Sequence, residues 1–218
     1  MGKVVAIDGP SGAGKSTIAK MLAGRLGFVY LDTGALYRAV ALYFLRRGIR
    51  PEDDDRALAA TLESADVRFK DGKVFLDGID VSREIRTTEV GHFSSVFSAR
   101  KTVRAFLLEV QRRASSDNDL VAEGRDTATV VFPEAYKKFY MDASVAERAR
   151  RRYAQLKELG MSVTEESAAR DVVERDRRDS EREIAPLMKS GDAVIIDTTN
   201  RTIEQILEEV LAVVRSDP

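Results

Sequence analysis

The chain contains no cysteine, and its only histidine is His92. Without cysteine there can be no disulfide bond, no thiol nucleophile and no cysteine-based zinc site. A single histidine does not build a histidine metal cluster and is a poor partner for a catalytic serine, so we interpret His92 as structural.

Long hydrophobic runs are also missing, since no stretch approaches the roughly 18 to 20 apolar residues of a membrane span. The first residues lead into a strand-like run rather than a signal peptide, so we expect a cytoplasmic protein without a membrane partner. The 35 basic and 36 acidic residues give a net charge of −1, which provides no electrostatic footprint for duplex nucleic acid. With 218 residues, 44% of them hydrophobic, the chain can bury one sizeable core.

The most informative motif follows an apolar run, Val4 to Ile7, near the start of the chain. It reads Gly9-Pro10-Ser11-Gly12-Ala13-Gly14-Lys15-Ser16 and fits the phosphate-binding pattern G-x-x-x-x-G-K-[ST] at every constrained position. Its glycines allow consecutive backbone N–H groups to point into one concave nest that holds phosphate oxygens. The motif predicts a nucleoside triphosphate site, and a plain glycine turn between strand and helix is the structural alternative.

The side chains of this loop have separate expected roles. Lys15 would reach the β and γ phosphates, and the Ser16 hydroxyl would bind Mg²⁺, the one cofactor that we expect. The helix that opens at Gly14 would direct its positive end at the anion, and Thr17 completes the predicted ATP-binding loop. Asp8, which closes the preceding strand, has two open interpretations: it supports the water shell of the metal, or it simply ends the strand.

Strand-like and helical patterns alternate along the rest of the chain. The strand-like runs are Lys3 to Asp8, Phe28 to Leu31, Leu120 to Glu123, Lys138 to Met141 and Ala193 to Ile196. Two helix starts read as capping boxes, Ser144 to Glu147 and Thr202 to Gln205. The alternation predicts the α/β class, with a parallel sheet of the P-loop NTPase type flanked by helices.

One segment breaks this rhythm. Val67 to Lys70, Lys73 to Leu76 and Ile79 to Val81 read as short strands joined by two tight turns, Asp71-Gly72 and Asp77-Gly78. We interpret the segment as a small antiparallel insertion. The sequence shows no repeat, low-complexity tract or proline-rich linker, so insertions in one P-loop core describe the layout better than independent domains.

The loop alone does not say which P-loop class is present. The sequence has no Asn-Lys-x-Asp motif for guanine and no Asp-x-x-Gly switch motif, which weighs against a small GTPase. It also lacks an apolar run that ends in an Asp-Glu pair, and it is short for a motor or AAA-type ATPase. Other features must therefore identify the class.

Arginines follow two of the predicted core strands. Arg38 lies shortly after the second strand, on a helix with Thr33 as its expected cap. Gly124-Arg125-Asp126 follows the third core strand, at the carboxyl end where ligands of open α/β sheets bind. Both arginines are therefore placed where the phosphates of a second substrate would arrive.

Two helical segments carry further arginines. Arg148 and Arg152 are four residues apart and share a helix face, so one could stack on a base while the other meets phosphates. On the long helix after Thr164, one stripe holds Arg175, Arg178, Asp179 and Arg182. Solvated helix faces with ion pairs are the ordinary interpretation of such segments, but phosphoryl transfer needs this charge neutralisation and exclusion of water.

Five groups of residues together resemble the bacterial-type cytidylate kinases, a family of nucleoside monophosphate kinases, over almost the whole chain. They are Ile7 to Lys15; Leu31-Asp32-Thr33-Gly34-Ala35-Leu36-Tyr37-Arg38; Asp80-Val81-Ser82 with Ile85-Arg86-Thr87; Gly124-Arg125-Asp126 with Thr129 to Pro133; and Glu174-Arg175-Asp176 followed by Asp179, Arg182 and Ala185-Pro186-Leu187. Adenylate kinases have Asp-Gly-[Phe/Tyr]-Pro-Arg where this chain has Glu-Gly-Arg-Asp, and the Asp-Arg-[Tyr/His] element of thymidylate kinases is missing.

The resemblance implies transfer of the γ-phosphoryl group of ATP-Mg²⁺ to CMP or dCMP, giving ADP and CDP or dCDP. It implies one domain, with a core at about 1–60, 100–147 and 190–218, a monophosphate-binding insertion at about 61–99, and a helical lid at about 148–189. Carried over position by position, the CMP site comprises Asp32, Thr33, Arg38, Ser95, Arg104, Arg125, Asp126, Asp179 and Arg182. Arg38 and Arg125 would hold the α-phosphate, and Asp179 would accept from the ribose hydroxyls.

The residues expected around cytosine suit that base. A carboxylate such as Asp126 matches the exocyclic amino group, and arginines match the ring nitrogen and carbonyl acceptors. Uracil presents the reverse pattern and would leave Asp126 facing a carbonyl oxygen, at a cost of about 1 to 3 kcal/mol. We therefore expect discrimination against UMP.

The resemblance also implies the catalytic set. Lys15 and Arg125 would act with three lid arginines, Arg152, Arg175 and Arg178, to stabilise charge on the transferring group. Arg148 would join the ATP-binding residues as part of the lid.

The sequence departs from the family at Thr127-Ala128, where a bulky apolar residue followed by glycine is common. If that glycine has positive φ, Ala128 would change the loop and the orientation of Asp126. Thr33 stands where serine is frequent and keeps the hydroxyl.

Two other hypotheses remain open: a kinase for another small acceptor, UMP or shikimate, or a non-catalytic ATP sensor. We expect a monomer, because no long apolar stripe lies beyond the core faces.

Overall fold

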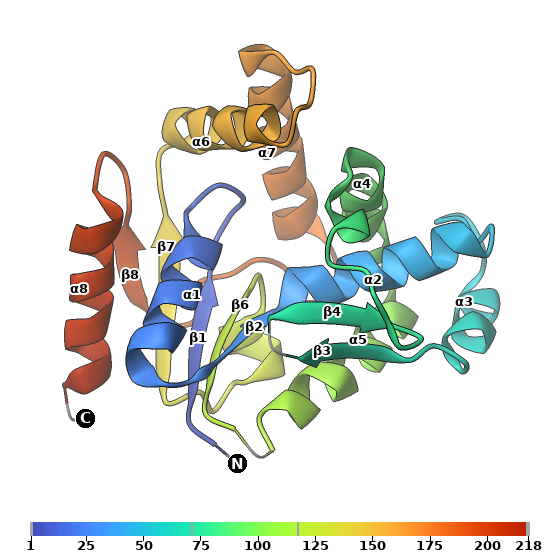
Figure 1. Ribbon diagram of the computed structural model, residues 1–218, viewed down its shortest axis with the longest axis horizontal. Coiled ribbons are helices and arrows are strands. Elements are labelled where there is room, and N and C mark those ends of the chain that lie inside the picture. The colour runs from blue at the N-terminus through green and yellow to red at the C-terminus, as the bar shows by residue number, and fades with distance from the viewer. Residues whose placement is uncertain (1, 71, 117, 217–218) are drawn as a thin grey trace.

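The centre of the molecule is a parallel β-sheet. The structure, a computed structural model, describes residues 2–70, 72–116 and 118–216, and in these residues five strands pair in the order β2-β6-β1-β7-β8 (Figure 1). The strands are β1 (Val4–Asp8), β2 (Val29–Asp32), β6 (Leu120–Gly124), β7 (Lys137–Asp142) and β8 (Val194–Asp197). This arrangement confirms the predicted α/β class, and each strand lies within one residue of its predicted bounds.

Helices cover both faces of the sheet because successive strand residues face opposite sides. On one side, Val5, Ile7 and Val121 pack with α1 (Lys15–Leu26) and α8 (Ile203–Arg215). On the other, Val4 and Leu120 pack with α2 (Thr33–Arg46) and α5 (Lys101–Ala114). The fully buried strand β1 lies between these layers, and it delivers the phosphate-binding loop at its carboxyl end.

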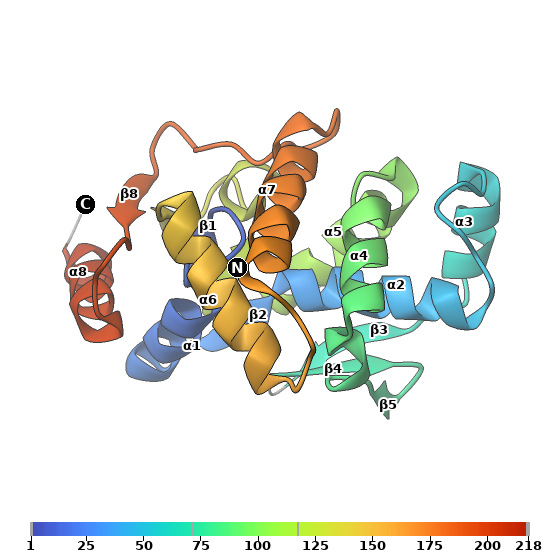
Figure 2. The same cartoon turned by 90° about the horizontal axis from the view of Figure 1, so that it is seen from above.

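The predicted insertion is confirmed as a small antiparallel sheet of β3 (Val67–Lys70), β4 (Lys73–Leu76) and β5 (Ile79–Asp80). The first predicted turn includes Asp71, which lies outside the described residues. The helix α3 (Asp55–Leu62) precedes this sheet, and a short 3₁₀ turn (Glu84–Arg86) and α4 (Thr88–Phe97) follow it. Viewed from above, α4 lies beside α2 (Figure 2).

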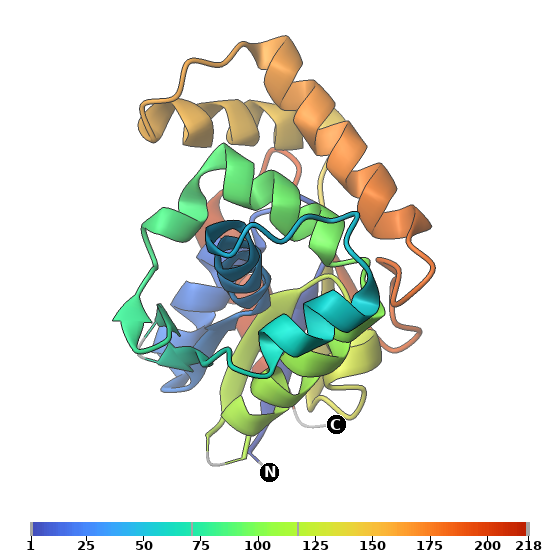
Figure 3. The same ribbon diagram turned by 90° about the vertical axis from the view of Figure 1, so that its right-hand side faces the viewer.

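Two helices lie over the carboxyl ends of the central strands. They are α6 (Val145–Glu158) and α7 (Glu165–Glu181), and they are seen above β1 and β7 in Figure 1. The side view shows them as an arch above α4 (Figure 3). These helices occupy most of the segment that we expect to form a lid, and together with α4 they lie around this end of the sheet.

The helix caps confirm some predictions and correct others. Thr202 and Gln205 form a complete capping box, as predicted. At α6, Ser144 accepts the N–H of Glu147, but the Glu147 carboxylate binds Arg150 and Arg151 instead of reaching back to the cap.

The cap of α2 and the end of α7 also differ from prediction. Asp32, not Thr33, caps α2, because its carboxylate accepts the Ala35 N–H at 2.9 Å. Thr33 is already helical, and its hydroxyl donates to the Glu123 carbonyl at 2.7 Å. Arg182 lies one residue beyond the helical part of α7, so the predicted stripe ends in an extended residue.

No helix in the described residues is long and apolar enough to cross a lipid bilayer.

Gly9 supplies a test of the turn after β1. Its φ is 148°, and a Cβ at this position would lie 1.9 Å from the Met141 carbonyl oxygen. Gly9→Ala should therefore lower the free energy of unfolding by about 3 kcal/mol or more, measured by urea denaturation. Gly24→Ala is the control, because nothing lies within 4 Å of that helical position and it should gain about 0.5 to 1 kcal/mol. Equal urea midpoints for Gly9→Ala and the wild type would contradict this account.

Candidate functional site

A cavity of about 990 Å³ opens at the carboxyl ends of the strands. Its walls come from the loop after β1, the ends of β2 and β6, the helices α4, α6 and α7, and the start of α8. Among the described residues, eleven cationic and seven anionic side chains line it. The volume lies at the upper end of the range of about 300 to 1,000 Å³ for ligand sites, and the charge suits polyanions.

The phosphate-binding loop has the geometry that its sequence predicts. Gly14 is in the left-handed region, with φ 90° and ψ 5°, and it begins α1. Ser11, Gly12, Gly14, Lys15, Ser16 and Thr17 line the cavity, whereas Gly9, Pro10 and Ala13 do not. Because α1 begins here, its first N–H groups and its positive end are directed at the cavity.

Lys15 is enclosed by the loop that it serves. Its side chain is buried, and its Nζ donates to the Pro10 carbonyl oxygen at 2.7 Å. Burial lowers the pKa of Lys15, and the nearby Arg125 and Arg175 lower it further. Bound phosphate would replace the carbonyl contact and offset this repulsion, so Lys15 is poised for an anion.

Glu123 is a functional candidate that the sequence analysis missed. It lies on β6, is buried, and accepts a hydrogen bond from the Tyr30 hydroxyl at 2.6 Å. Burial and the neighbouring Asp32 raise the pKa of Glu123, while Lys15 and Ser16 act in the opposite sense. The available signal was an acidic residue inside an apolar strand next to the strand that carries the phosphate loop.

The middle of the cavity concentrates arginines around few carboxylates. Arg125 Nε donates to Asp179 Oδ2 at 2.8 Å. Burial lowers the pKa of Arg175 to about 9, and repulsion from Arg125 and Arg38 contributes. In the described residues the buried Arg175 Nε has no hydrogen-bond partner. An anion that approaches this group would therefore meet several cations, among them the unpartnered Nε of Arg175.

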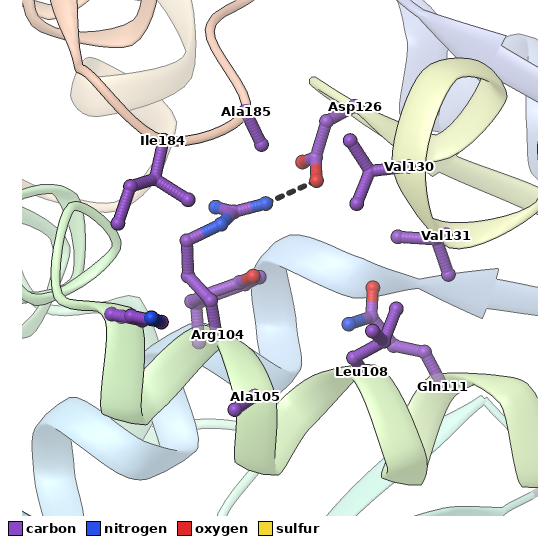
Figure 4. Close-up of a pocket in the computed structure, with 11 residues that line it drawn as sticks. Arg104, Ala105, Leu108, Gln111, Asp126, Val130, Val131, Ile184 and Ala185 are labelled. Atoms are coloured by element: carbon purple, nitrogen blue, oxygen red, sulfur yellow. Dashed lines mark hydrogen bonds and ion pairs between the residues drawn. The ribbon is translucent and has the colours of Figure 1, made fainter.

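Asp126 lines the cavity and lies between two arginines. Arg104 forms an ion pair with Asp126 Oδ2, shown as a dashed line in Figure 4, and Arg182 Nη2 lies 3.3 Å from Asp126 Oδ1. All three side chains are nearly buried. On the nearby α4, the Ser95 hydroxyl has no partner among the described residues. A planar polar group entering from the main cavity would meet donors and acceptors together.

A smaller cavity of about 170 Å³ lies on the other side of Asp126. Apolar side chains, among them Leu108 and Val131, form much of its wall, and Arg104 faces it (Figure 4). It shares Tyr37 and Asp126 with the main cavity.

Most of the residues predicted for the second substrate meet in one place. Asp32, Thr33, Arg38, Ser95, Arg125, Asp126, Asp179 and Arg182 line the main cavity, and Arg104 lines the smaller one behind Asp126. Of the predicted catalytic residues, Lys15, Arg125, Arg152 and Arg175 line the main cavity. Their convergence from distant parts of the chain makes this cavity the candidate site.

Two predicted arginines are placed differently. Arg178 does not line the cavity, and its Nε lies 3.9 Å from Glu174 Oε1 on the same helix. Arg148 is buried behind the phosphate loop, where it donates to backbone carbonyls. Arg151, which the sequence analysis passed over, lines the cavity and donates to Thr198 Oγ1 at 3.0 Å. Arg148, Arg151 and Arg152 lie within five residues of one helix, and the sequence alone does not show which of them faces the cavity.

Asp8 is the last residue of β1, and its side chain makes contacts that neither of its two interpretations included. Its two carboxylate oxygens accept the backbone N–H groups of Thr127 and Ala128, at 2.9 and 2.7 Å. Burial raises the pKa of Asp8. Asp8 therefore anchors the π-helical turn, Thr127–Val131, that follows the Asp126 loop. In the described residues, the non-glycine residues with positive φ are Asp77, Ala185 and Asn200. Ala128 is not among them, so an alanine where the family commonly has glycine does not strain this loop.

The chain is similar to known proteins over nearly its whole length. A sequence model of the family described as cytidylate kinase matches residues 5–216. The cytidylate kinase of Thermodesulfovibrio yellowstonii is 50% identical over 221 residues, covering 100% of both chains. That of Geobacter sp. strain M21 is 52% identical, covering 95% of this chain and 90% of the relative. The structure of a gluconokinase from Sinorhizobium meliloti 1021 is similar with a TM-score of 0.50 at 15% identity, covering 98% of this chain and 91% of that one, which shows the fold alone.

The lowered pKa of Lys15 gives a prediction for ligand binding. A triphosphate beside Nζ should raise that pKa again, so binding at an alkaline pH such as about 8.5 should take up protons. The uptake should shrink as the pH falls, because free Lys15 then becomes protonated before the ligand arrives. Isothermal titration calorimetry with ATP in two buffers of different ionisation enthalpy measures the proton count.

Lys15→Arg is the control for this measurement, since an arginine stays charged in both states and should reduce the uptake. Lys20→Arg, which changes another lysine of the cavity wall, should leave it unchanged. Equal proton counts for wild type and Lys15→Arg would show that Lys15 is fully charged before the ligand binds.

Proposed function

Because the chain belongs to the cytidylate kinase family, and is thus a nucleoside monophosphate kinase, we propose that it transfers the γ-phosphoryl group of ATP to CMP or dCMP. The products would be ADP and CDP or dCDP. One observation carries the choice of acceptor: Asp126 lines the same cavity as the phosphate loop and is flanked by Arg104 and Arg182. This group offers a carboxylate for the cytosine amino group and guanidinium donors for its acceptors.

ATP would bind at the phosphate loop. The N–H groups at the start of α1 and the Lys15 ammonium would hold its β and γ phosphates. Arg150 and Arg151 line the cavity on the α6 side, and Ile203 and Ile206 line it at the start of α8. Those residues would enclose the remainder of the nucleotide between a charged and an apolar wall.

Mg²⁺ fits this site. Ser16 is exposed to the cavity, and the buried Glu123 carboxylate has its pKa raised by burial and by Asp32, so a cation nearby would be favourable. No group of three histidine or carboxylate residues in the described chain could hold a metal by itself. Ser16, with the carboxylates of Glu123 and Asp32 on the same cavity wall, would thus hold a metal that arrives with the triphosphate. When bound, Mg²⁺ neutralises charge on the phosphate oxygens.

The acceptor phosphate would lie among the central arginines. Arg38 and Arg125 would hold it, in line with the phosphoryl group at Lys15. Asp179 keeps Arg125 in place through a hydrogen bond of 2.8 Å and would also accept from a ribose hydroxyl. Arg152 and Arg175 would neutralise charge on the transferring group, because both line the same cavity.

The elements around the cavity would divide the work. The antiparallel sheet with α4 would form the monophosphate-binding part, since Ser94, Ser95 and Ser98 of the α4 segment line the acceptor end. The helices α6 and α7 would form the lid that excludes water from the transferring phosphoryl group. The remaining elements would form the core of one kinase domain.

The direct test follows ADP formation by the purified protein with ATP and Mg²⁺, using CMP, dCMP, UMP, AMP, dTMP and shikimate in separate reactions. CMP and dCMP should give rapid turnover, and UMP should be at least tenfold poorer in kcat/KM because its base opposes the Asp126 carboxylate. ADP formation that no acceptor increases would overturn the kinase proposal and favour a sensor. Fast turnover with UMP or shikimate instead would overturn the cytosine assignment.

Asp126→Asn should change the acceptor preference. The amide can turn its NH₂ toward the uracil carbonyl, so kcat/KM for CMP should fall about ten- to a hundredfold while the UMP to CMP ratio rises. Steady-state kinetics with both acceptors measures this. Asp192→Asn is the control, since that exposed carboxylate binds Lys138 away from the cavity. Equal losses with CMP and UMP would mean that Asp126 supports the fold and does not read the base.

A further inference from the structure

Two lid residues hold one peptide segment of the phosphate loop from behind. Asp176 Oδ1, on α7, accepts the backbone N–H of Ser11 at 3.2 Å. Arg148 Nη1, on α6, donates to the Ser11 carbonyl oxygen at 3.2 Å. Arg148 also forms an ion pair with Asp176, and its Nε donates to the Ala143 carbonyl at 3.0 Å. Both backbone polar groups of Ser11 are thus bound by one charged pair.

The contact of Arg148 and Asp176 with the phosphate loop is close and largely excludes solvent. Only 5% of Arg148 is exposed, and 20% of the Asp176 side chain is exposed. A Cβ added to Gly12 would lie 2.8 Å from the Arg148 carbonyl oxygen and 2.9 Å from its Cβ, so α6 rests directly on the loop. A buried ion pair with satisfied hydrogen bonds has one favoured geometry, which makes it suited to fixing a backbone.

Neither residue lines the cavity, although the residues beside them do. Arg175 precedes Asp176 on α7 and faces the cavity, where it would meet the transferring phosphoryl group. The same turn of α7 therefore holds the loop through Asp176 and directs the preceding residue, Arg175, into the cavity.

We propose that Arg148 and Asp176 are positioning residues that keep the phosphate loop in its triphosphate-binding shape and set Arg175 at a fixed place relative to it. This rests on the proposed phosphoryl transfer from ATP. The pair acts on the ATP end, because the acceptor end of α7 is held separately through Asp179 with Arg125 and Arg182 with Asp126. The expected Arg148 contact with ATP is thereby replaced by an indirect role.

The test compares Asp176→Asn, Asp176→Ala and Arg148→Lys with the wild type. Asparagine can still accept the Ser11 N–H but loses the ion pair, whereas alanine loses both. Lysine keeps the charge but cannot reach the Ser11 carbonyl, the Ala143 carbonyl and Asp176 together. We expect KM for ATP to rise about tenfold for Asp176→Ala and Arg148→Lys, and less for Asp176→Asn. KM for CMP should stay within about twofold.

Glu181→Gln is the matched control. It removes an exposed ion pair with Arg177 on the same helix, with side chains 62% and 63% exposed, and should leave both KM values unchanged. Thermal unfolding of each variant identifies any that fail to fold. If Asp176→Ala or Arg148→Lys fails to fold, the KM for ATP of Asp176→Asn decides the test, because asparagine keeps the shape of the side chain.

Two outcomes would overturn the proposal. One is a lower melting temperature with unchanged KM for ATP, as expected of an ordinary structural ion pair. The other is an equal rise in both KM values, as expected of a general loss of the lid. Calorimetric titration with ATP alone tests the same prediction without an acceptor, so a protein that failed to phosphorylate CMP would still decide whether Asp176 positions the loop.

Discussion

The candidate site depends on the gathering of like charges, several of them buried, around one cavity. Eleven cationic side chains meet seven anionic ones around the main cavity. Burial lowers the pKa of Lys15 and of Arg175, and repulsion from neighbouring arginines lowers both further. Such a cluster stays in place only because the fold holds it, and polyanionic ligands relieve the strain. Affinity for phosphate is therefore built in before any ligand arrives.

The helix α7 distributes the carboxylates that hold this cluster. It is tied to α6 through the pairs Asp171–Arg152 and Asp176–Arg148, and Asp176 also accepts the Ser11 N–H of the phosphate loop. The loop after β6 is held through Asp179–Arg125 and, just beyond the end of α7, through Arg182–Asp126. In three of these ion pairs α7 supplies the carboxylate and the partner is an arginine from another element. In the fourth, Arg182 supplies the cation and Asp126 the carboxylate. One rigid element thus spans the donor and acceptor ends, so a shift of the helix at one end changes the geometry at the other.

The sequence predicted those parts that depend on local pattern. The loop at Gly9 to Ser16, the core strands and the antiparallel insertion each follow from spacing within a short window. The sequence did not predict which of several neighbouring arginines faces the cavity, because Arg148, Arg151 and Arg152 share one helix face and differ only in their partners. Glu123 was missed since its role comes from burial beside another strand. Asp32 and not Thr33 caps α2, because the Thr33 hydroxyl donates to the Glu123 carbonyl oxygen on the neighbouring strand β6.

The pairing of Asp126 explains how a charged group can select a base without being rearranged. Arg104 donates to one carboxylate oxygen and Arg182 approaches the other, so the side chain is oriented before substrate binds. A carboxylate has about four lone-pair sites, so each oxygen keeps acceptor capacity for an amino group. Cytosine can join this arrangement while both ion pairs persist. Uracil would bring a carbonyl oxygen against the remaining lone pairs, and the fixed arginines prevent the carboxylate from turning away. The selectivity for cytosine that we propose would then follow from the rigidity that the two arginines impose.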